Sequence, residues 1–274
     1  MNVLIRDDFD PQKIIRSGQC FRAAEIGDGL FRFITGRHVL YLKQQSPKKW
    51  AVSCTSYTWQ HIWKPYFDRE RNYEALRASI PAEDTYLTEC AAYGKGIRIL
   101  RQDPLETLIT FIISQRKSIP AIRSSVEKLC TLAGEEIVTP YETLRTFPSL
   151  PALRALSEKE LQDCSLGYRA PYIAKTAACL SEKPSLLREL SDAADEDLLA
   201  ALMSLPGVGI KVAGCTALFA YGRTALAPVD VWIGRVIGEK YGGHNPFPAY
   251  GAAAGIMQQY MFFHAQTTKM KSPR

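Results

Sequence analysis

Lys211 stands at an unusual place for a positive charge. It follows the turn sequence Leu-Pro-Gly-Val-Gly at residues 205–209 and falls in the first turn of a helix predicted to begin near Ile210. The positive end of the helix dipole disfavours an ammonium group there, and partial burial disfavours it further. A lysine held as a neutral amine is a nucleophile that forms a Schiff base with a sugar carbon. The alternative is an ordinary lysine that binds phosphate as a point charge.

A carboxylate follows nineteen residues later, in the sequence Pro-Val-Asp-Val-Trp. Asp230 stands where a further helix is predicted to start, and the commoner role of an aspartate at such a place is to cap the helix. Alternatively, Asp230 faces Lys211, stabilises positive charge that develops on a sugar, and helps to move the proton of the lysine. Together the two residues predict covalent amine catalysis more strongly than either does alone.

The turn before Lys211 predicts a ligand that carries phosphate. Gly207 and Gly209 permit backbone conformations closed to other residues, and they let a phosphate approach the N–H groups at the start of the new helix. Residues from about 196 to 220 are therefore predicted to form a helix-hairpin-helix, which grips one DNA strand through its backbone without reading sequence. A tight turn between two helices with a glycine cap is the alternative.

Composition narrows the class of protein. The chain has 274 residues, of which 46% are hydrophobic and 23% charged, and its net charge of +6 mildly favours an anionic partner. Seven cysteines are scattered without a Cys-x-x-Cys pair, and four histidines show no zinc spacing. We therefore expect reduced thiols, no bound metal and a cytoplasmic location. No secretory signal and no membrane-spanning run are expected.

The chain divides into a part rich in strands and a longer helical part. Residues 30–44 alternate around a turn at Gly36, and residues 48–56 read as another strand. From the helix start at Asp103 and Pro104 onwards, helical segments are separated by glycine and proline. The predicted fold class is α+β, with an N-terminal antiparallel β-sheet domain, residues 1–85, packed on a mainly α-helical body, residues 86–274.

The sequences around Lys211 and Asp230 resemble the helix-hairpin-helix/Gly-Pro-Asp superfamily of DNA glycosylases, and specifically its members with a catalytic lysine. One such branch, the endonuclease III-like enzymes, carries four cysteines after the aspartate to hold an iron–sulfur cluster. No cysteine follows Cys215 here, so no cluster is expected. The chain is more similar to the other branch, the 8-oxoguanine DNA glycosylases, over residues 17 to about 265.

That resemblance assigns roles to further residues. The sequence Ser-Gly-Gln-Cys-Phe-Arg implies that the carbonyl of Gly18 accepts the N7 hydrogen that 8-oxoguanine has and guanine lacks. Gln258 would read the Watson–Crick edge of the flipped base, while Phe262 and Cys215 would contact its two faces. Core packing is the alternative for Phe262 and Cys215, and a surface position beside Gln259 is the alternative for Gln258.

The remaining implied contacts are to DNA. Tyr168 and Arg169 occupy the place where family members wedge into the duplex. Arg116 and Lys117 replace an asparagine run of the family, and we expect them to bind phosphate or to stack into the space left by the flipped base. A solvated basic loop is the alternative. Trp232 stands where the animal enzymes have a histidine, and in this respect the chain is similar to bacterial members. Its side chain either stacks on DNA or packs internally.

The predicted function is that of a bifunctional DNA glycosylase and AP lyase that excises 8-oxoguanine in base excision repair. The expected partner is damaged double-stranded DNA, bound by a monomer associated with the nucleoid. No cofactor is required, although hairpin carbonyls around residues 205–208 offer a place for a monovalent cation. The alternatives are a glycosylase for alkylated purines, a non-catalytic DNA clamp, and, with no specific support, a protein-interaction domain on the N-terminal sheet.

Overall fold

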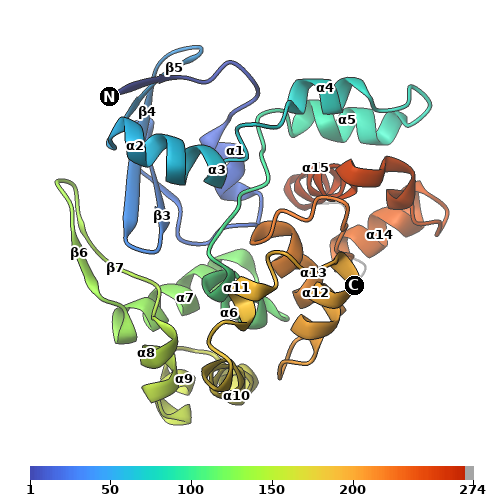
Figure 1. The fold of residues 1–274 in the computed structure, drawn as a ribbon. Helices are drawn as coiled ribbons and strands as arrows, with labels where there is room; N and C mark the ends of the chain where they lie inside the picture. Colours follow the sequence, from blue (N-terminus) through green and yellow to red (C-terminus); the bar gives the residue numbers. More distant parts are fainter. Residues whose placement is uncertain (269–274) are drawn as a thin grey trace. The chain divides into compact units, whose positions relative to one another are not determined.

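The computed structural model describes residues 1–268 (Figure 1). The chain forms two compact units. We call the first the sheet unit; it comprises residues 1–33, 40–101 and 222–268. We call the second the hairpin unit; it comprises residues 34–39 and 102–221. The chain therefore passes from the hairpin unit back to the sheet unit after Tyr221.

The sheet is antiparallel and five-stranded, in the order β1-β5-β4-β3-β2. Its strands are β1 (Asn2–Leu4), β2 (Ala24–Gly27), β3 (Leu30–Thr35), β4 (His38–Ser46) and β5 (Lys49–Val52). In the pairing of β4 with β5, Leu42 lies opposite Val52. Phe33, Leu40 and Trp50 are buried in one core cluster with the aromatic residues that follow the sheet. The predicted fold class is confirmed.

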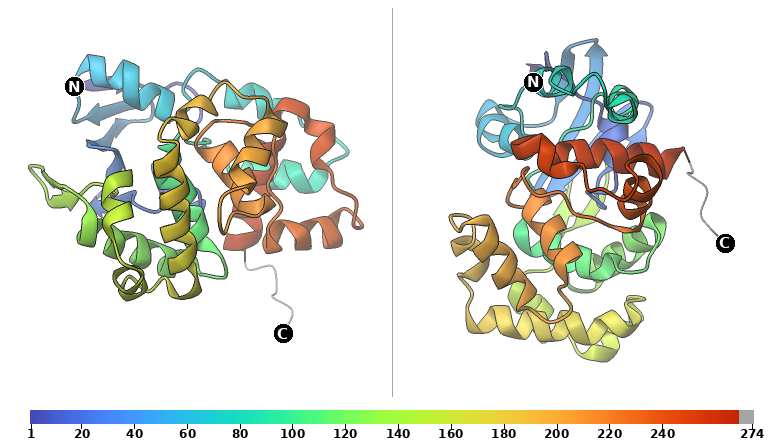
Figure 2. Two further views of the ribbon diagram at one scale, coloured as in Figure 1. Left: turned by 60° about the horizontal axis from the view of Figure 1, so that its bottom comes forward. Right: turned by 90° about the vertical axis from the view of Figure 1, so that its right-hand side faces the viewer.

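Helices form the rest of the sheet unit, including much of the region that the sequence predicted to be rich in strands. They are α1 (Pro11–Arg16), α2 (Ser56–Thr58), the π-helix η1 (Trp59–Trp63), α3 (Lys64–Tyr66), α4 (Tyr73–Ala78), α5 (Thr85–Tyr93), α14 (Val231–Lys240), the 3₁₀-helix η3 (Phe247–Ala253) and α15 (Ala254–Thr267). The rings of Phe33 and Phe67 meet edge to face at 5.0 Å, which ties the segment after α3 to the sheet. Figure 2 shows α15 beside α5.

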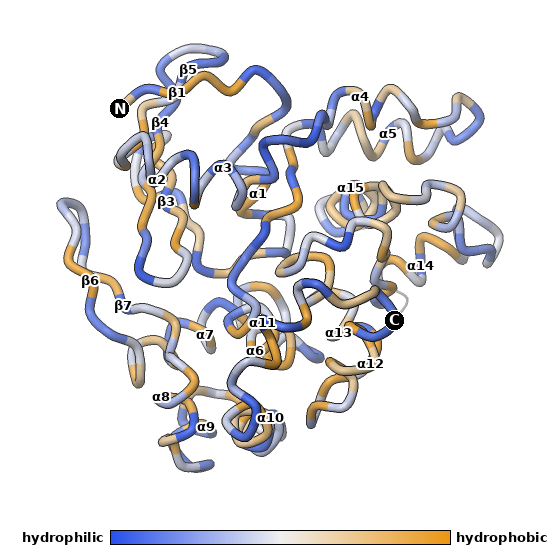
Figure 3. Tube along the Cα trace, viewed as in Figure 1, coloured by the Kyte–Doolittle hydropathy of each residue, from blue (hydrophilic) through white to orange (hydrophobic). Residues whose placement is uncertain are grey.

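Between residues 102 and 221, the hairpin unit is helical except for one short ribbon that the sequence did not predict. Its elements are α6 (Pro104–Ser114), α7 (Ile119–Ala133), β6 (Glu136–Val138), β7 (Thr143–Arg145), α8 (Leu150–Ala155), α9 (Glu158–Asp163), the 3₁₀-helix η2 (Gly167–Arg169), α10 (Ala170–Glu182), α11 (Leu186–Glu189), α12 (Asp195–Met203) and α13 (Ile210–Phe219). The apolar residues of α6 and α13 appear in orange in Figure 3, and both helices are largely buried.

Two helix starts follow the capping rules from which they were predicted. Asp103 accepts the backbone N–H of Glu106 at 2.9 Å and caps α6, with Pro104 in its first turn. Asp230 does the same for α14 by accepting the N–H of Ile233. Within residues 1–268, no helix combines the length and the apolar character needed to cross a membrane.

Candidate active site

The hairpin that carries Lys211 needs glycine at one of its two glycine positions. Gly207 has a φ of +77°, and a Cβ atom there would lie 2.6 Å from the side chain of Tyr172. Gly209 has an ordinary extended backbone, and a Cβ atom there would meet nothing within 4 Å. The interpretation that both glycines adopt conformations closed to other residues is therefore right for Gly207 and wrong for Gly209. Open space in front of Gly209 is compatible with the predicted approach of a phosphate.

Neighbouring helices hold the hairpin through its carbonyl groups. The hydroxyl of Thr176 on α10 donates to the carbonyl of Pro206 at 2.8 Å, and the side-chain amide of Gln115 donates to that of Gly207 at 3.1 Å. Among residues 1–268, no side chain caps α13, so its first N–H groups are available to a ligand at the positive end of the helix. The geometry is suited to holding a phosphate. The predicted cation at residues 205–208 remains a prediction.

Lys211 is half-buried, and the part of α13 that follows it is inaccessible. Every residue from Val212 to Phe219 is buried, including Cys215, which lies one turn after the lysine. The ammonium of Lys211 lies 3.5 Å from the hydroxyl of Ser114 and 4.9 Å from the ring centroid of Phe111, both in the last turn of α6. The lysine is thus the one side chain with a basic nitrogen on α13, and the helix that carries it is fixed by packing.

Asp230 begins α14 in the sheet unit and is half-buried. One carboxylate oxygen accepts the N–H of Ile233 at 2.9 Å, so the predicted capping role is present. The residues on either side, Val229 and Val231, are 44% and 78% exposed, so this stretch of the chain lies on a surface of its unit. Capping is thus observed for Asp230, and its catalytic role stays a prediction.

The two adjacent glutamines of α15 have different roles. Gln259 donates from its side-chain amide to the carbonyl of Ser17 at 2.5 Å and so ties α15 to the loop of Gly18. Gln258 is 5% exposed, and its amide oxygen has no hydrogen-bond partner among the residues described. A buried amide oxygen without a partner is costly, which favours a ligand for Gln258. Phe262, one turn later, is half-buried.

Gly18 has a φ of +74°, which favours glycine. The hydrogen bond from Gln259 to Ser17 therefore holds the loop of Gly18, which is predicted to test N7, beside α15, which is predicted to read the base. Both segments belong to the sheet unit. Sequence reasoning passed over Ser17 and Gln259. The sequence indicated these two residues only by their positions, Ser17 next to Gly18 and Gln259 next to Gln258.

The four side chains of the hairpin unit that are predicted to contact DNA fall into two kinds. Arg116 is exposed, has a φ of +52°, and its guanidinium has no partner among residues 1–268. Tyr168 is 50% exposed. Arg169 is buried, donates to the carbonyls of Leu166 and Gln115, and lies over the ring of Tyr168 at 4.3 Å. Arg116 and Tyr168 are thus presented to solvent, whereas Arg169 is held internally.

Lys117 is also held internally. Its ammonium donates to the hydroxyl of Ser125 at 2.5 Å and to the carbonyl of Ser165, a residue with a φ of +62°. Burial, together with the nearby charges of Arg169 and Lys128, lowers the pKa of Lys117. A phosphate would have to replace both hydrogen bonds, so the phosphate contact of Lys117 stays a prediction. In the sheet unit, Trp232 is half-buried, with the guanidinium of Arg235 at 5.2 Å from its ring.

Arg116 and Lys117 are expected to differ in the salt dependence of DNA binding. Each phosphate neutralised adds about 0.9 to the slope of log affinity against log salt. Arg116→Met should lower that slope by about one contact, because its guanidinium is free to meet phosphate. Lys117→Met should leave the slope nearly unchanged, because its ammonium is already hydrogen-bonded. Titration of undamaged duplex at several salt concentrations measures both, and a slope reduced equally in the two variants would contradict the distinction.

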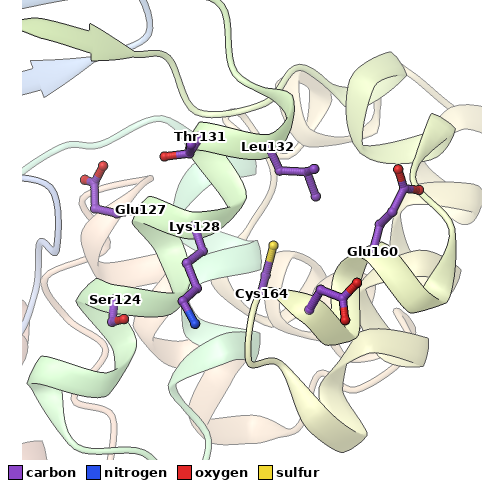
Figure 4. Close-up of a pocket in the computed structure, with 8 residues that line it drawn as sticks. Ser124, Glu127, Lys128, Thr131, Leu132, Glu160 and Cys164 are labelled. Atoms are coloured by element: carbon purple, nitrogen blue, oxygen red, sulfur yellow. The ribbon is translucent and has the colours of Figure 1, made fainter.

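A cavity of the hairpin unit contains none of the predicted site residues. It measures about 550 Å³ and lies along α7 and α9 (Figure 4). Its lining includes Leu132 and Cys164, with Lys128 and Glu160 at the sides. Burial raises the pKa of the Cys164 thiol, so this thiol is a poor nucleophile. We therefore place the candidate chemistry at Lys211 and not in this cavity.

No three histidine, cysteine, aspartate or glutamate side chains are grouped so as to hold a metal ion in the part of the chain that the structure describes. The expectation that the chemistry needs no metal or cluster stays a prediction.

The chain belongs to the HhH-GPD superfamily of base excision DNA repair proteins, whose family model matches residues 109–254. Residues 3–108 match the model of the 8-oxoguanine DNA glycosylase N-terminal domain, which places the chain in the 8-oxoguanine glycosylase branch. The resemblance seen in the sequence is therefore confirmed.

Relatives and solved structures agree with this placement. The chain is 31% identical over 236 residues to a probable N-glycosylase/DNA lyase of Methanothermobacter thermautotrophicus, covering 76% of this chain and 73% of that protein. It is 33% identical over 230 residues to an N-glycosylase/DNA lyase of Arabidopsis thaliana, covering 79% of this chain and 62% of that protein. The 8-oxoguanine glycosylase/lyase of Clostridium acetobutylicum, solved with double-stranded DNA containing cytosine opposite 8-oxoguanine, matches with a TM-score of 0.89 and 26% identity over 98% of this chain and 99% of that one.

Proposed function

We propose that this chain is a bifunctional DNA glycosylase and AP lyase that excises 8-oxoguanine from duplex DNA. The observation that carries the proposal is Lys211, a half-buried amine in the first turn of the helix α13, whose following residues are buried. Membership of the 8-oxoguanine glycosylase branch supports the substrate, and relatives named N-glycosylase/DNA lyase support both steps. A monomer suffices, because one chain carries every residue that the chemistry needs.

The chemistry assigned to Lys211 is nucleophilic. Its neutral amine attacks C1′ of the flipped nucleotide, the bond from C1′ to the base breaks, and the base leaves with the bonding electrons and takes up a proton. The amine gives up one proton as the base departs and passes the other to O4′ when the C1′–O4′ bond breaks, which leaves a Schiff base between Nζ and C1′. Removal of a proton from C2′ then breaks the bond to the 3′ oxygen and nicks the strand. The carboxylate of Asp230 stabilises positive charge on the sugar as the base departs.

Recognition of the base is assigned to the residues that the family resemblance implies. Gln258 supports the reading of the Watson–Crick edge, because its buried amide oxygen lacks a partner among residues 1–268. Gly18 is assigned the N7 hydrogen, and Phe262 and Cys215 the faces of the base. Arg116, Tyr168, Trp232 and the hairpin glycines are assigned to DNA outside the flipped nucleotide, with Arg169 supporting Tyr168.

Borohydride trapping tests this function directly, because the reagent reduces a Schiff base to a stable cross-link. We expect a trapped complex on a duplex with 8-oxoguanine opposite cytosine and on a duplex with an abasic site. Trapping on the abasic duplex alone would keep the amine chemistry and reject the base. Trapping on a duplex with an alkylated purine instead would favour the alkylpurine alternative, and tight binding without any trapping would favour the non-catalytic clamp.

The double role of Asp230 makes two substitutions informative. Asp230→Asn should lower the rate of base excision by about 100-fold or more, because an amide cannot stabilise developing positive charge as a carboxylate does. Its melting temperature should stay at the wild-type value, because asparagine caps a helix as well as aspartate does. Asp230→Ala should lose the rate and, in addition, about 1 kcal/mol of stability through the lost cap. Single-turnover excision and thermal unfolding of the two variants separate these effects. Wild-type excision by Asp230→Asn would confine this residue to capping.

A further inference from the structure

The last turn of α6 touches the amine of Lys211 through a hydroxyl whose orientation is set by its own helix. The hydroxyl of Ser114 donates its hydrogen to the carbonyl of Phe111 at 2.7 Å. Its oxygen can then only accept, and the nitrogen of Lys211 lies 3.5 Å from it. Hydrogen bonds at catalytic groups are often long before substrate binds. Among the described residues of the hairpin unit, Ser114 is the only side chain with a hydrogen bond to Lys211.

The ring of Phe111 fixes the other side of this contact. The nitrogen of Lys211 lies 4.9 Å from the ring centroid. The same ring is buried and stacks on Phe219 at 5.6 Å with an interplanar angle of 16°. Because Lys211 and Phe219 both belong to α13, the ring lies along this helix and cannot turn without disturbing its packing. Ser114 and Phe111 thus form a rigid seat for the amine.

We propose that Ser114 is a positioning residue that aims the lone pair of Lys211; this inference rests on the proposed function. A neutral amine has two N–H bonds and one lone pair. The acceptor oxygen of Ser114 engages one N–H, so the lone pair cannot point at Ser114 and is turned away from the seat. An amine whose lone pair is already oriented reaches the sugar carbon without a search over rotamers, which lowers the entropic barrier to attack. Ser114 thereby acts through Lys211 and does not contact DNA through its own hydrogen.

Ser114→Ala removes the acceptor and leaves Lys211 and Phe111 in place. We expect borohydride trapping on a duplex with a preformed abasic site to slow about tenfold under single-turnover conditions, as for the loss of one hydrogen bond. The affinity for the same duplex, measured without borohydride, should change by less than about twofold. Ser114→Thr keeps the hydroxyl and should restore most of the rate.

Ser181→Ala is the matched control. Its hydroxyl also donates to a carbonyl of its own helix, that of Ala177 at 2.7 Å, and it belongs to the same unit. This variant should trap at the wild-type rate. Wild-type trapping by Ser114→Ala, or an equal loss of rate in both alanine variants, would overturn the inference. So would a loss of DNA affinity in Ser114→Ala as large as its loss of rate. Absence of trapping by the wild-type protein would reject the proposed function itself, and the inference with it.

Discussion

Replacing Lys211 by glutamine should abolish borohydride trapping on every duplex and lower lesion excision by several orders of magnitude. An amide nitrogen has no available lone pair, so neither attack on C1′ nor a Schiff base is possible. Glutamine retains polarity and approximate length, and the helix that carries it is held by buried residues 212–219. Binding to the lesion duplex should therefore stay within a few-fold of the wild-type value. Trapping followed on a denaturing gel, with affinity measured in parallel, gives both quantities.

A lysine of the same unit provides the control for charge. Lys159 is 83% exposed at its side chain and pairs with Asp163 on the surface of α9. Lys159→Gln removes one positive charge without touching α13 or the hairpin, and should trap as the wild type does. Excision at the wild-type rate by Lys211→Gln would show that the amine is not the nucleophile, and a water molecule activated elsewhere would then have to be sought.

Replacing Arg98 by methionine should severely lower the free energy of unfolding. Arg98 is fully buried, and its five N–H groups all donate: to the carbonyls of residues 67, 8, 68 and 71, and to the carboxylate of Asp7 at 2.9 Å. Its guanidinium also lies 4.1 Å from the ring centroid of Tyr73. Methionine fills part of the space and makes none of these bonds.

The cost is large because the partners are left behind. Burial alone would raise the pKa of Asp7, but N–H donors from Tyr73 and Glu74 together with Arg98 outweigh it and lower that pKa. Breaking a buried ion pair costs roughly 3–5 kcal/mol, against a total stability of roughly 5–15 kcal/mol for a protein domain. Thermal unfolding should show a fall in melting temperature of many degrees.

The control for Arg98 is an exposed ion pair in the same unit. Lys64 pairs with Glu70 at 3.5 Å, and the Glu70 side chain is 82% exposed. Lys64→Met should cost less than about 1 kcal/mol, because water screens such a pair. Equal losses in the two variants would mean that the network around Arg98 contributes no more than a surface charge does.

The residues that a turn or a cap places locally were predictable from the sequence. Asp103 and Asp230 cap their helices, and α13 begins at Ile210 as predicted. Each of these outcomes depends on residues within about four positions, where capping and helix rules apply. The ribbon of β6 and β7 was missed because strands of three residues are too short to show alternation.

Contacts between distant segments were beyond sequence reasoning. Gln259 and Ser17 are 242 residues apart, and nothing near either residue indicates the other. Lys117 looked like a phosphate ligand because it lies in a basic loop, whereas its partner Ser165 lies 48 residues away. In both cases tertiary structure decides which of two adjacent residues is presented to a ligand. The buried amide oxygen of Gln258 and the exposed guanidinium of Arg116 have no partner among residues 1–268, whereas their neighbours are hydrogen-bonded internally.

The burial of α13 determines which partner has to move during a catalytic cycle. A helix enclosed from Val212 to Phe219 cannot slide or turn toward a target, so Lys211, the proposed nucleophile, would keep its place. The nucleotide would then make the whole movement, because it would have to leave the base stack and reach the amine. Unstacking costs a few kcal/mol and costs least for a base that is already mismatched or damaged. With a stationary amine, the low cost of unstacking a damaged nucleotide would favour lesions before any side chain reads the base.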